Sequence, residues 1–314
     1  MKLNKCLLIT WVIALSTYVQ TSYAQQDAMF TQYMFNTLAI NPAYAGSNEV
    51  ITATGLFRRQ WVNIDGAPTT GTFSIDAPLL NEKVGVGLNI VADQIGITST
   101  VGVFASYAYR IKLNERGRLA MGLQAGFSQY SADLANASLD QAGTVDPAFE
   151  SNISELMPNV GVGLWYNDDR LYAGISAPHL LNNSLSSDYQ FLSSTDGARQ
   201  FRHYFALVGY IFDLTTDIKL RPSVLFKAVE GAPMQFDFNG TVWFYEKVGV
   251  GLSYRTSDSI DALLEFQLTP QFRLGYAYDY TLTDLQDYNS GSHELMLRYQ
   301  FSFKRSKIIT PRFF

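Results

Sequence analysis

The sequence predicts an all-β protein, a transmembrane antiparallel up-and-down β-barrel of about 14 strands. Between Val50 and Phe303, short segments alternate apolar and polar residues and are separated by turns. Because side chains of a strand point to opposite faces in turn, each segment has one apolar and one polar face. The polar faces carry charges of both signs, so we expect the apolar faces to contact lipid and the polar faces to line a salt-bridged lumen.

The alternation places the expected strands one after another along the chain. They are residues 50–59, 68–77, 83–91, 97–111, 117–130, 158–166, 170–176, 199–213, 217–227, 233–244, 247–255, 260–268, 271–280 and 293–303. An even number suits a bacterial outer-membrane barrel, in which both chain ends lie in the periplasm.

The last segment shows the alternation most clearly. Its apolar residues are Leu295, Leu297, Tyr299, Phe301 and Phe303, and between them lie Glu294, Met296, Arg298, Gln300 and Ser302. Over all segments, the charged residues expected in the lumen are Arg110, Lys219, Arg221, Lys227, Asp237, Arg255, Asp261, Glu265, Arg273, Asp279, Glu294 and Arg298. Aromatic residues near strand ends suggest interfacial girdles: Tyr109, Trp165, Tyr166, Trp243, Tyr245 and Tyr280.

The connections give a second, independent indication of a barrel. Every second connection is short: Pro78–Glu82, Lys112–Arg116, Asn167–Asp169, Leu214–Thr216, Tyr245–Glu246 and Thr269–Pro270. The long ones all belong to the other set: Gln60–Ala67, Ser131–Pro158, Ala177–Ala198 and Thr281–Ser292. Short periplasmic turns and longer extracellular loops are typical of outer-membrane barrels.

A glycine-rich repeat lies inside three of the expected strands. Glu-Lys-Val-Gly-Val-Gly-Leu occurs at residues 82–88 and 246–252, and Val-Gly-Val-Gly-Leu at 160–164. A nucleotide-binding fingerprint needs a turn from a strand into a helix, which is not expected here. We therefore expect these glycines to leave space on the lumen face or to let a strand bend.

The first 24 residues resemble a cleaved secretory signal. Lys2 and Lys5 precede an apolar stretch from Leu7 to Leu15, and Ser22-Tyr23-Ala24 predicts cleavage after Ala24. Cys6, the only cysteine, lies within this signal, so the mature chain is expected to contain no thiol. Removal of both lysines leaves 21 basic residues against 28 acidic ones, a balance that argues against nucleic acid as a partner.

No pattern in the sequence predicts catalysis, a cofactor or a metal site. His179, His203 and His293 are isolated, and no second histidine or cysteine lies at metal-ligand spacing. Ser292 and His293 are neighbours, but adjacent strand residues point to opposite faces. Asp279, Asp284 and Asp287 lack the regular spacing of a calcium loop.

Residues 25–49 fall outside the strand pattern and are dense in aromatic and apolar side chains. Pro42 and Gly46 are expected to end any helix and to permit a left-handed turn. Because a disordered tail would be polar, we expect this segment to be docked. Two alternatives are a lid or plug tucked against the lumen wall and a docking surface that faces the periplasm. The barrel is followed by a basic tail, residues 304–314.

Three motifs resemble the PorP/SprF-type outer-membrane proteins of the Bacteroidota type IX secretion and gliding machinery. They are Phe30-Thr-Gln-Tyr-Met-Phe-Asn36, Asn41-Pro-Ala-Tyr-Ala-Gly46 and Arg59-Gln-Trp61, and the closing strand Ser292–Phe301 is also similar. The motif residues that we consider candidates for docking are Phe30, Gln32, Tyr33, Asn36, Asn41, Pro42, Tyr44, Gly46, Arg59, Gln60 and Trp61.

The resemblance implies a non-enzymatic component of the bacterial outer membrane that supports secretion or cell-surface attachment of a secreted adhesin-like protein. It implies as partners outer-membrane lipid, the secreted protein, and a periplasmic ring or peptidoglycan-binding component. It leaves open whether the chain is a core component or the anchor of one adhesin. The alternative is a passive channel for small or fatty solutes.

Overall fold

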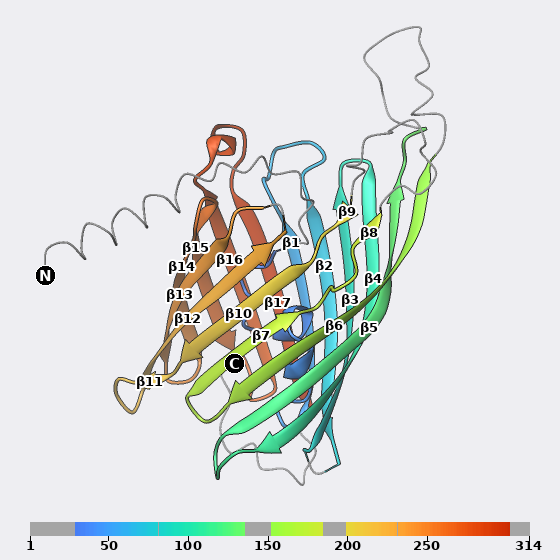
Figure 1. The fold of residues 1–314 in the computed structure, drawn as a ribbon. Helices are drawn as coiled ribbons and strands as arrows, with labels where there is room; N and C mark the ends of the chain where they lie inside the picture. The colour runs from blue at the N-terminus through green and yellow to red at the C-terminus, as the bar shows by residue number, and fades with distance from the viewer. Residues whose placement is uncertain (1–28, 81, 136–151, 185–198, 231, 302–314) are drawn as a thin grey trace, which may run out of the picture.

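The computed structural model describes residues 29–80, 82–135, 152–184, 199–230 and 232–301 (Figure 1). The predicted signal, residues 1–24, and the basic tail, residues 304–314, lie outside the described residues. No helix among the described residues has the length and apolar character needed to span a membrane.

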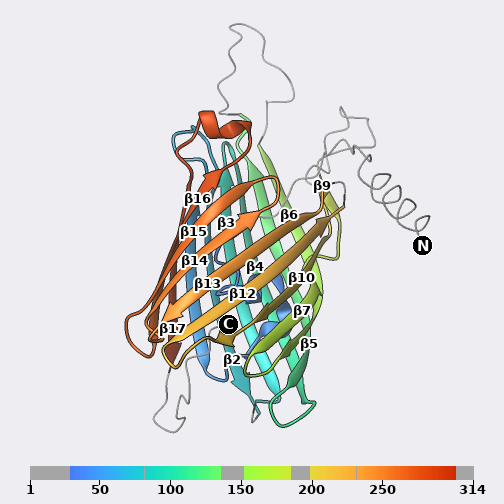
Figure 2. The ribbon, with the colours of Figure 1, turned by 90° about the vertical axis from the view of Figure 1, so that its left-hand side faces the viewer.

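Strands make up most of the described chain, and they wind around one axis with a pronounced tilt (Figures 1 and 2). The strands of the large sheet are β1 (Ile51–Arg59), β2 (Thr69–Leu79), β3 (Val84–Ile95), β4 (Thr98–Lys112), β5 (Arg118–Ala132), β6 (Ile153–Asn167), β7 (Leu171–Ala177), β10 (His203–Tyr210), β11 (Phe212–Asp213), β12 (Ile218–Val229), β13 (Gln235–Phe244), β14 (Val248–Arg255), β15 (Ser259–Gln267), β16 (Phe272–Thr281) and β17 (Ser292–Phe301). The remaining elements are the pair β8 (Asn183–Ser184) and β9 (Arg199–Gln200) and the short helices α2 (Thr37–Ile40), η1 (Pro42–Tyr44) and η3 (Asp284–Asp287).

The sheet is a closed antiparallel barrel. Each strand pairs with its neighbours in sequence, β1 pairs with β17, and β10 pairs with both β7 and β12. The small strand β11 continues β10 beyond Ile211 and also pairs with β12. Counting β10 and β11 as one crossing, 14 strands form the wall. The predicted fold class is therefore confirmed.

The two ends of the barrel differ in their connections. At one end, which we call the turn end, the connections are residues 80–83, 113–117, 168–170, 214–217, 245–247 and 268–271. At the other, which we call the loop end, lie the longer connections 60–68, 133–152, 178–202 and 282–291 and the shorter ones 96–97, 230–234 and 256–258. By the rule for outer-membrane barrels, the loop end faces outward and the turn end faces the periplasm.

The predicted facing of the strands agrees with the exposure of their side chains. Leu297 is 42% exposed on the outer surface, whereas Gln300 on the same strand is 8% exposed and faces the lumen. Of the charged residues predicted to face the lumen, all but Lys219 are buried, and Lys219 is half-buried. The outer face is apolar, as expected for contact with lipid.

Several predicted strands have different limits in the structure. The strand predicted at 83–91 continues to Ile95. The strand predicted at 158–166 begins earlier, at Ile153, and so contains Pro158. The pairing of β7 with β6 begins only at Val162, so Pro158 has a single neighbouring strand, β5. A proline is tolerated there because no strand on its other side needs a hydrogen bond from its missing N–H group. The strand predicted at 199–213 is interrupted, because Arg199–Gln200 pairs with β8 and the wall begins at His203.

The predicted aromatic girdles are wrong for two tryptophans. Tyr109, Tyr245 and Tyr280 are exposed on the outer surface, but Trp165 and Trp243 are each 1% exposed and face the lumen. The alternation along the strand explains the inward facing of Trp243, because this residue shares a face with the buried residues Asn239 and Thr241. There its ring packs against the guanidinium of Arg273, 4.8 Å from the ring centre.

Candidate functional site in the barrel lumen

Residues 29–48, which we call the N-terminal segment, lie inside the barrel (Figures 1 and 2, blue). Near the loop end, the carbonyl of Phe30 accepts a hydrogen bond from Arg255 at 3.4 Å. Near the turn end, the N–H group of Gly46 donates to Asp76 at 2.8 Å. The segment therefore runs through the lumen from the loop end to the turn end before β1 begins.

This position favours a lid or plug against the lumen wall over a docking surface that faces the periplasm. Most of its side chains are buried against the wall, so they do not form a surface that faces the periplasm. All the candidate residues of the first two motifs are at least nine-tenths buried, namely Phe30, Gln32, Tyr33, Asn36, Asn41, Pro42, Tyr44 and Gly46. The apolar and aromatic composition of the segment is explained by this burial.

The predicted break at the second motif is present, and Asn41 organises it. Its backbone is extended, which ends α2, and its side-chain oxygen accepts the N–H group of Ala43 at 3.0 Å as η1 begins at Pro42. The side-chain amide of Asn41 also donates to the carbonyl of Leu164 at 3.0 Å. Gly46 then adopts the left-handed conformation, with a φ of 70°. The motif thus both turns the chain and attaches it to β6.

Polar side chains of the first motif attach the segment to several strands. Asn36 donates to the hydroxyl of Thr72 and accepts a hydrogen bond from Ser74, both at 2.9 Å. The hydroxyl of Tyr33 lies 3.1 Å from that of Ser223. Since β2 and β12 lie on different sides of the barrel, these bonds hold the segment across the lumen.

Two aromatic rings of the segment make specific contacts with the wall. Tyr44 packs edge-on against Trp165, with ring centres 5.3 Å apart. The ring of Phe35 lies 5.1 Å from the guanidinium of Arg221 and 5.3 Å from that of Arg273. Arg298 approaches the same ring at 6.0 Å. Such cation–π contacts offset part of the cost of placing three cations around one buried site.

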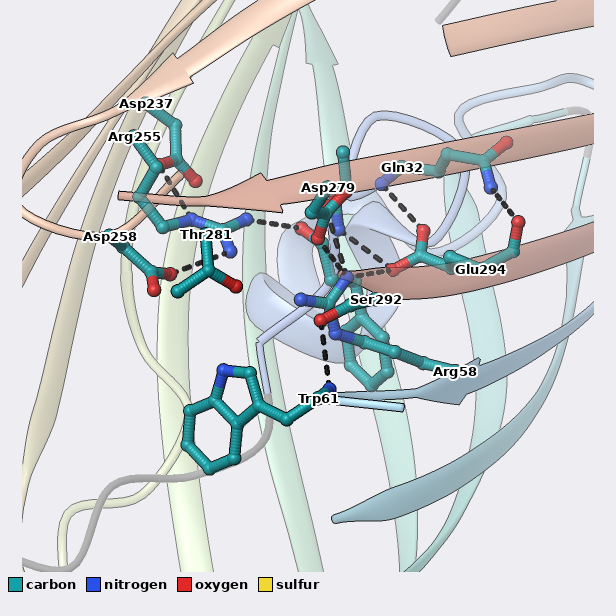
Figure 3. Close-up of polar contacts among 12 residues, drawn as sticks. Gln32, Arg58, Trp61, Asp237, Arg255, Asp258, Asp279, Thr281, Ser292 and Glu294 are labelled. Carbon is teal, nitrogen blue, oxygen red and sulfur yellow. Dashed lines mark hydrogen bonds and ion pairs between the residues drawn. The ribbon is translucent and has the colours of Figure 1, made fainter. Parts of the chain in front are cut away.

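A buried group of polar residues, which we call the Arg58 cluster, joins the first strand, the last two strands and the N-terminal segment (Figure 3). It consists of Thr31, Arg58, Asp279 and Glu294. Arg58 forms ion pairs with Asp279 at 2.6 Å and with Glu294 at 3.1 Å. Glu294 also accepts the backbone N–H groups of Thr31 at 2.9 Å and Gln32 at 2.7 Å. Charges buried in this way are tolerated only when they are paired and hydrogen-bonded.

A second ion-pair group lies beside the Arg58 cluster at the loop end. Arg255 pairs with Asp237 at 2.9 Å and with Asp258 at 3.2 Å, and its guanidinium also donates to the backbone carbonyl of Phe30 at 3.4 Å (Figure 3). Arg221 pairs with Glu265 at 2.8 Å nearer the middle of the barrel. Part of the predicted mixture of charges is therefore organised into local ion pairs on β1 and β12–β17.

The third motif, Arg59-Gln60-Trp61, lies outside the lumen at the loop end. Arg59 is exposed on the outer surface, and the backbone of Gln60 donates to Pro68 at 2.9 Å. The backbone N–H group of Trp61 donates to the hydroxyl of Ser292 at 3.2 Å (Figure 3). Because Val62 also pairs with Gly291, the first and last loops are joined beside the Arg58 cluster.

Sequence reasoning did not identify Arg58, the residue that links the third motif to the first. The signal was present in the alternation of β1, in which Thr52, Thr54, Leu56 and Arg58 share the buried face. Arg59 has the opposite facing. The expectation that Glu294 and Asp279 face the lumen, by contrast, agrees with their exposures of 1% and 2%.

The glycines of the repeated sequence make room for the N-terminal segment. A Cβ atom at Gly85 would overlap the carbonyl of Ala45, and one at Gly163 would overlap the side chain of Asn41. Gly122 and Gly275 are similarly close to Ala43 and Gln32. In the copy at residues 246–252, Gly249 lies under the ring of Trp243 instead. The glycines therefore leave space on the lumen face both for the N-terminal segment and for a large side chain of the wall.

The residues considered for catalysis or metal binding are not brought together. Ser292 faces the lumen, while His293 faces outward and shares a hydrogen bond with Tyr276 at 2.6 Å. Asp279 belongs to the Arg58 cluster, whereas Asp284 lies on the exposed helix η3. Within the described ranges, no group of three or more His, Cys, Asp or Glu residues could hold a metal ion.

These features define the class of protein: an outer-membrane β-barrel whose lumen contains its own N-terminal segment. Residues 22–299 match the family model of the type IX secretion system membrane protein PorP/SprF. The chain belongs to this family. A search of curated proteins found no match.

Solved structures with a similar fold include transport proteins of bacterial membranes. The Ralstonia pickettii toluene transporter TbuX shares 10% identity and a TM-score of 0.51, over 85% of this chain and 93% of that chain. The CymD monoaromatic hydrocarbon channel shares 12% identity and a TM-score of 0.48, over 88% of this chain and 93% of that chain. A Pseudomonas aeruginosa FadL homologue shares 13% identity and a TM-score of 0.46, over 83% of this chain and 93% of that chain. At these identities the likeness concerns the fold alone.

Proposed function

We propose that this protein is a non-enzymatic component of the type IX secretion machinery that supports secretion or cell-surface attachment of a secreted adhesin-like protein. The observation that carries the proposal is the N-terminal segment, which occupies the lumen and is bonded to strands on several sides. A barrel filled by its own chain is suited to anchor other proteins rather than to conduct solutes. Membership of the PorP/SprF family supports the same role.

Partner contact in this proposal uses the two ends of the barrel. The secreted protein meets the loop end, where the first and last loops are joined through Trp61 and Ser292. A periplasmic ring or peptidoglycan-binding component meets the turn end, where Arg118 pairs with both Glu49 and Glu82. The buried motif residues then act by holding the lumen closed and the barrel rigid.

The alternative function, a passive channel for small or fatty solutes, is supported by the fold that the chain shares with TbuX. It requires the N-terminal segment to leave the lumen or to leave a path beside it. The bonds of Glu294 to Thr31 and Gln32 oppose such a movement.

Deletion of the gene tests the proposal in cells. We expect loss of one or more surface proteins from the cell surface, detected by labelling intact cells, and restoration by the wild-type gene. Affinity purification of the protein from native outer membranes should co-purify a secreted surface protein or a periplasmic component of the machinery. Normal surface display together with normal secretion in the deletion strain would exclude the proposed role.

A further inference from the structure

In the described strands of the barrel wall, Arg59 is the only charged residue whose position in the alternation faces outward. Its side chain is exposed, and among the described residues it forms no ion pair with a carboxylate. A cationic side chain that faces lipid is costly at the middle of the membrane and much less so at its surface. The position of Arg59 along the wall therefore decides what it can contact.

Arg59 lies where the first strand leaves the membrane. β1 has nine residues, and Arg59 is the last of them at the loop end. A tilted strand needs about 9–11 residues to cross the hydrocarbon core. Phe57 and its partner Leu295, one outward position nearer the middle of the barrel, are 52% and 43% exposed to the apolar surroundings. Because the loop end faces outward, Arg59 is expected at the level of the polar headgroups of the outer leaflet.

The neighbours of Arg59 at this level are polar and not acidic. The register places His293 of β17 and Thr69 of β2 directly opposite Arg59, so the three side chains are neighbours on one face. Nδ1 of His293 shares a hydrogen bond with the hydroxyl of Tyr276 at 2.6 Å. When this hydroxyl donates, the ring proton of His293 lies on Nε2, which is then a hydrogen-bond donor. The surface around Arg59 is therefore suited to an anionic group.

Apolar surface continues directly from Arg59 toward the middle of the membrane. On the outward face Phe57 lies opposite Gly71, and Phe73 lies opposite Gly55. A Cβ atom added at either glycine would meet no atom within 4 Å, so both glycines leave open space beside the exposed phenylalanine rings. A molecule with an anionic head and hydrocarbon chains matches the order of these surfaces along the wall.

Phosphate is the anionic headgroup that fits this surface best. A guanidinium group forms two parallel hydrogen bonds with a phosphate, which an ammonium group does not. The outer leaflet of a bacterial outer membrane consists largely of lipopolysaccharide, whose lipid A anchor carries phosphate directly above its acyl chains. Phospholipids also carry phosphate, but they lie mainly in the inner leaflet, at the level of the turn end. The place of Arg59 at the loop end therefore favours lipid A.

We propose that Arg59, with His293 beside it, binds a phosphate group of lipid A, and that an acyl chain of the same lipid lies along Phe57, Gly71 and Phe73. The site gives a role to the exposed arginine of the third motif, which the contacts inside the lumen do not use. It is independent of the secretion role proposed above, because it concerns only the lipid around the barrel.

Native mass spectrometry of the mature full-length protein, titrated with lipid in detergent, tests the site. Bisphosphorylated lipid A is the probe, its dephosphorylated form is the matched control, and phosphatidylglycerol is the phospholipid control. We expect the wild-type protein to bind lipid A at least about tenfold more tightly than either control. Equal affinity for the two forms of lipid A would refute a phosphate site, and equal affinity for phosphatidylglycerol would refute lipid A as its occupant.

Two arginine variants locate the phosphate. Arg59→Gln should lower the affinity for lipid A to that for the dephosphorylated form, which itself should bind as before. Arg116→Gln, at a side chain that is 78% exposed at the turn end, should keep the wild-type preference. A folded Arg59→Gln variant that still prefers the phosphorylated form would contradict the assignment. The comparison of lipids on the wild-type protein stands even if a variant fails to fold.

Photo-crosslinking in intact cells identifies what covers this surface in the membrane. Phe57→benzoylphenylalanine places a photoreactive group one outward position from Arg59. We expect a crosslinked product that contains lipid A, identified by mass spectrometry of the purified adduct. An adduct with another protein in place of lipid A would show that Arg59 belongs to a protein interface and would overturn the proposal.

Discussion

The carboxylate of Glu294 accepts the backbone N–H group of Gln32 at a distance of 2.7 Å. This bond joins the last strand of the barrel to the segment that precedes the first strand. The same carboxylate is paired with Arg58 on β1, so barrel closure and the position of the N-terminal segment depend on one buried group.

Replacement Glu294→Gln tests this dependence. The amide leaves Arg58 paired with Asp279 alone and would turn a donor toward at least one donor of the segment, so we expect a loss of about 1–3 kcal/mol in the free energy of unfolding, as for a buried donor that loses its acceptor. Urea titration in lipid vesicles measures it. Glu230→Gln, at an exposed carboxylate of a loop, should change stability by less than about 0.5 kcal/mol. Equal effects of the two changes would show that the Arg58 cluster does not hold the segment.

Replacement Gly85→Ala tests the close contact between the wall and the segment. The added methyl group would overlap the carbonyl of Ala45, so either strand β3 or the segment must shift, at a cost of about 1–3 kcal/mol. We expect faster hydrogen exchange of the backbone around Ala45. In the control Gly240→Ala the methyl group meets no atom within 4 Å, and exchange should stay as in the wild type. Unchanged exchange in both variants would contradict the packing described.

Phe35→Leu separates ring electrostatics from apolar burial. Leucine retains most of the apolar surface but not the π-face that Arg221, Arg273 and Arg298 approach. Buried cation–π contacts contribute up to about 2 kcal/mol, so we expect a loss of about 1–3 kcal/mol in unfolding experiments. Phe57→Leu on the lipid-facing surface, where Phe57 is 52% exposed, is the matched control and should cost less. A control variant as unstable as Phe35→Leu would refute a special role for the arginines.

Leu297→Arg and Gln300→Arg test the facing of the last strand. Leu297 lies on the lipid face, where an arginine at mid-membrane costs about 2–4 kcal/mol, while an arginine at the lumen-facing Gln300 should cost little. Folding titrations of both variants in vesicles give the comparison. If both positions tolerated arginine equally, the assignment of the lipid face would be reversed.

Much of the fold could be predicted from the sequence, because the strand period and the connection lengths are local properties. The alternation placed Leu297 outside and Gln300 inside, in agreement with their exposures. Prediction failed where the usual location of a residue type was preferred to the alternation. Trp165 was assigned to a girdle because of its type and its place near a strand end, although the alternation puts it on the lumen face.

The candidate site was harder to predict, because its contacts join residues far apart in the chain. Composition indicated that the N-terminal segment is docked, and the motifs marked Gln32 and Asn41 within it. No local pattern showed that Gln32 meets Glu294, 262 residues later. The glycine repeat suggested spared volume, but only the packed barrel shows that Gly85 faces Ala45.

The central claim is that the N-terminal segment occupies the lumen, as the proposed anchoring role requires and an open pore would not. Conductance of the purified mature protein in planar lipid bilayers tests this most directly. We predict little or no solute conductance for the wild-type protein, and a large conductance once residues 25–48 are deleted from a barrel that still folds. A large conductance of the wild-type protein that the deletion leaves unchanged would contradict the account and favour a passive channel.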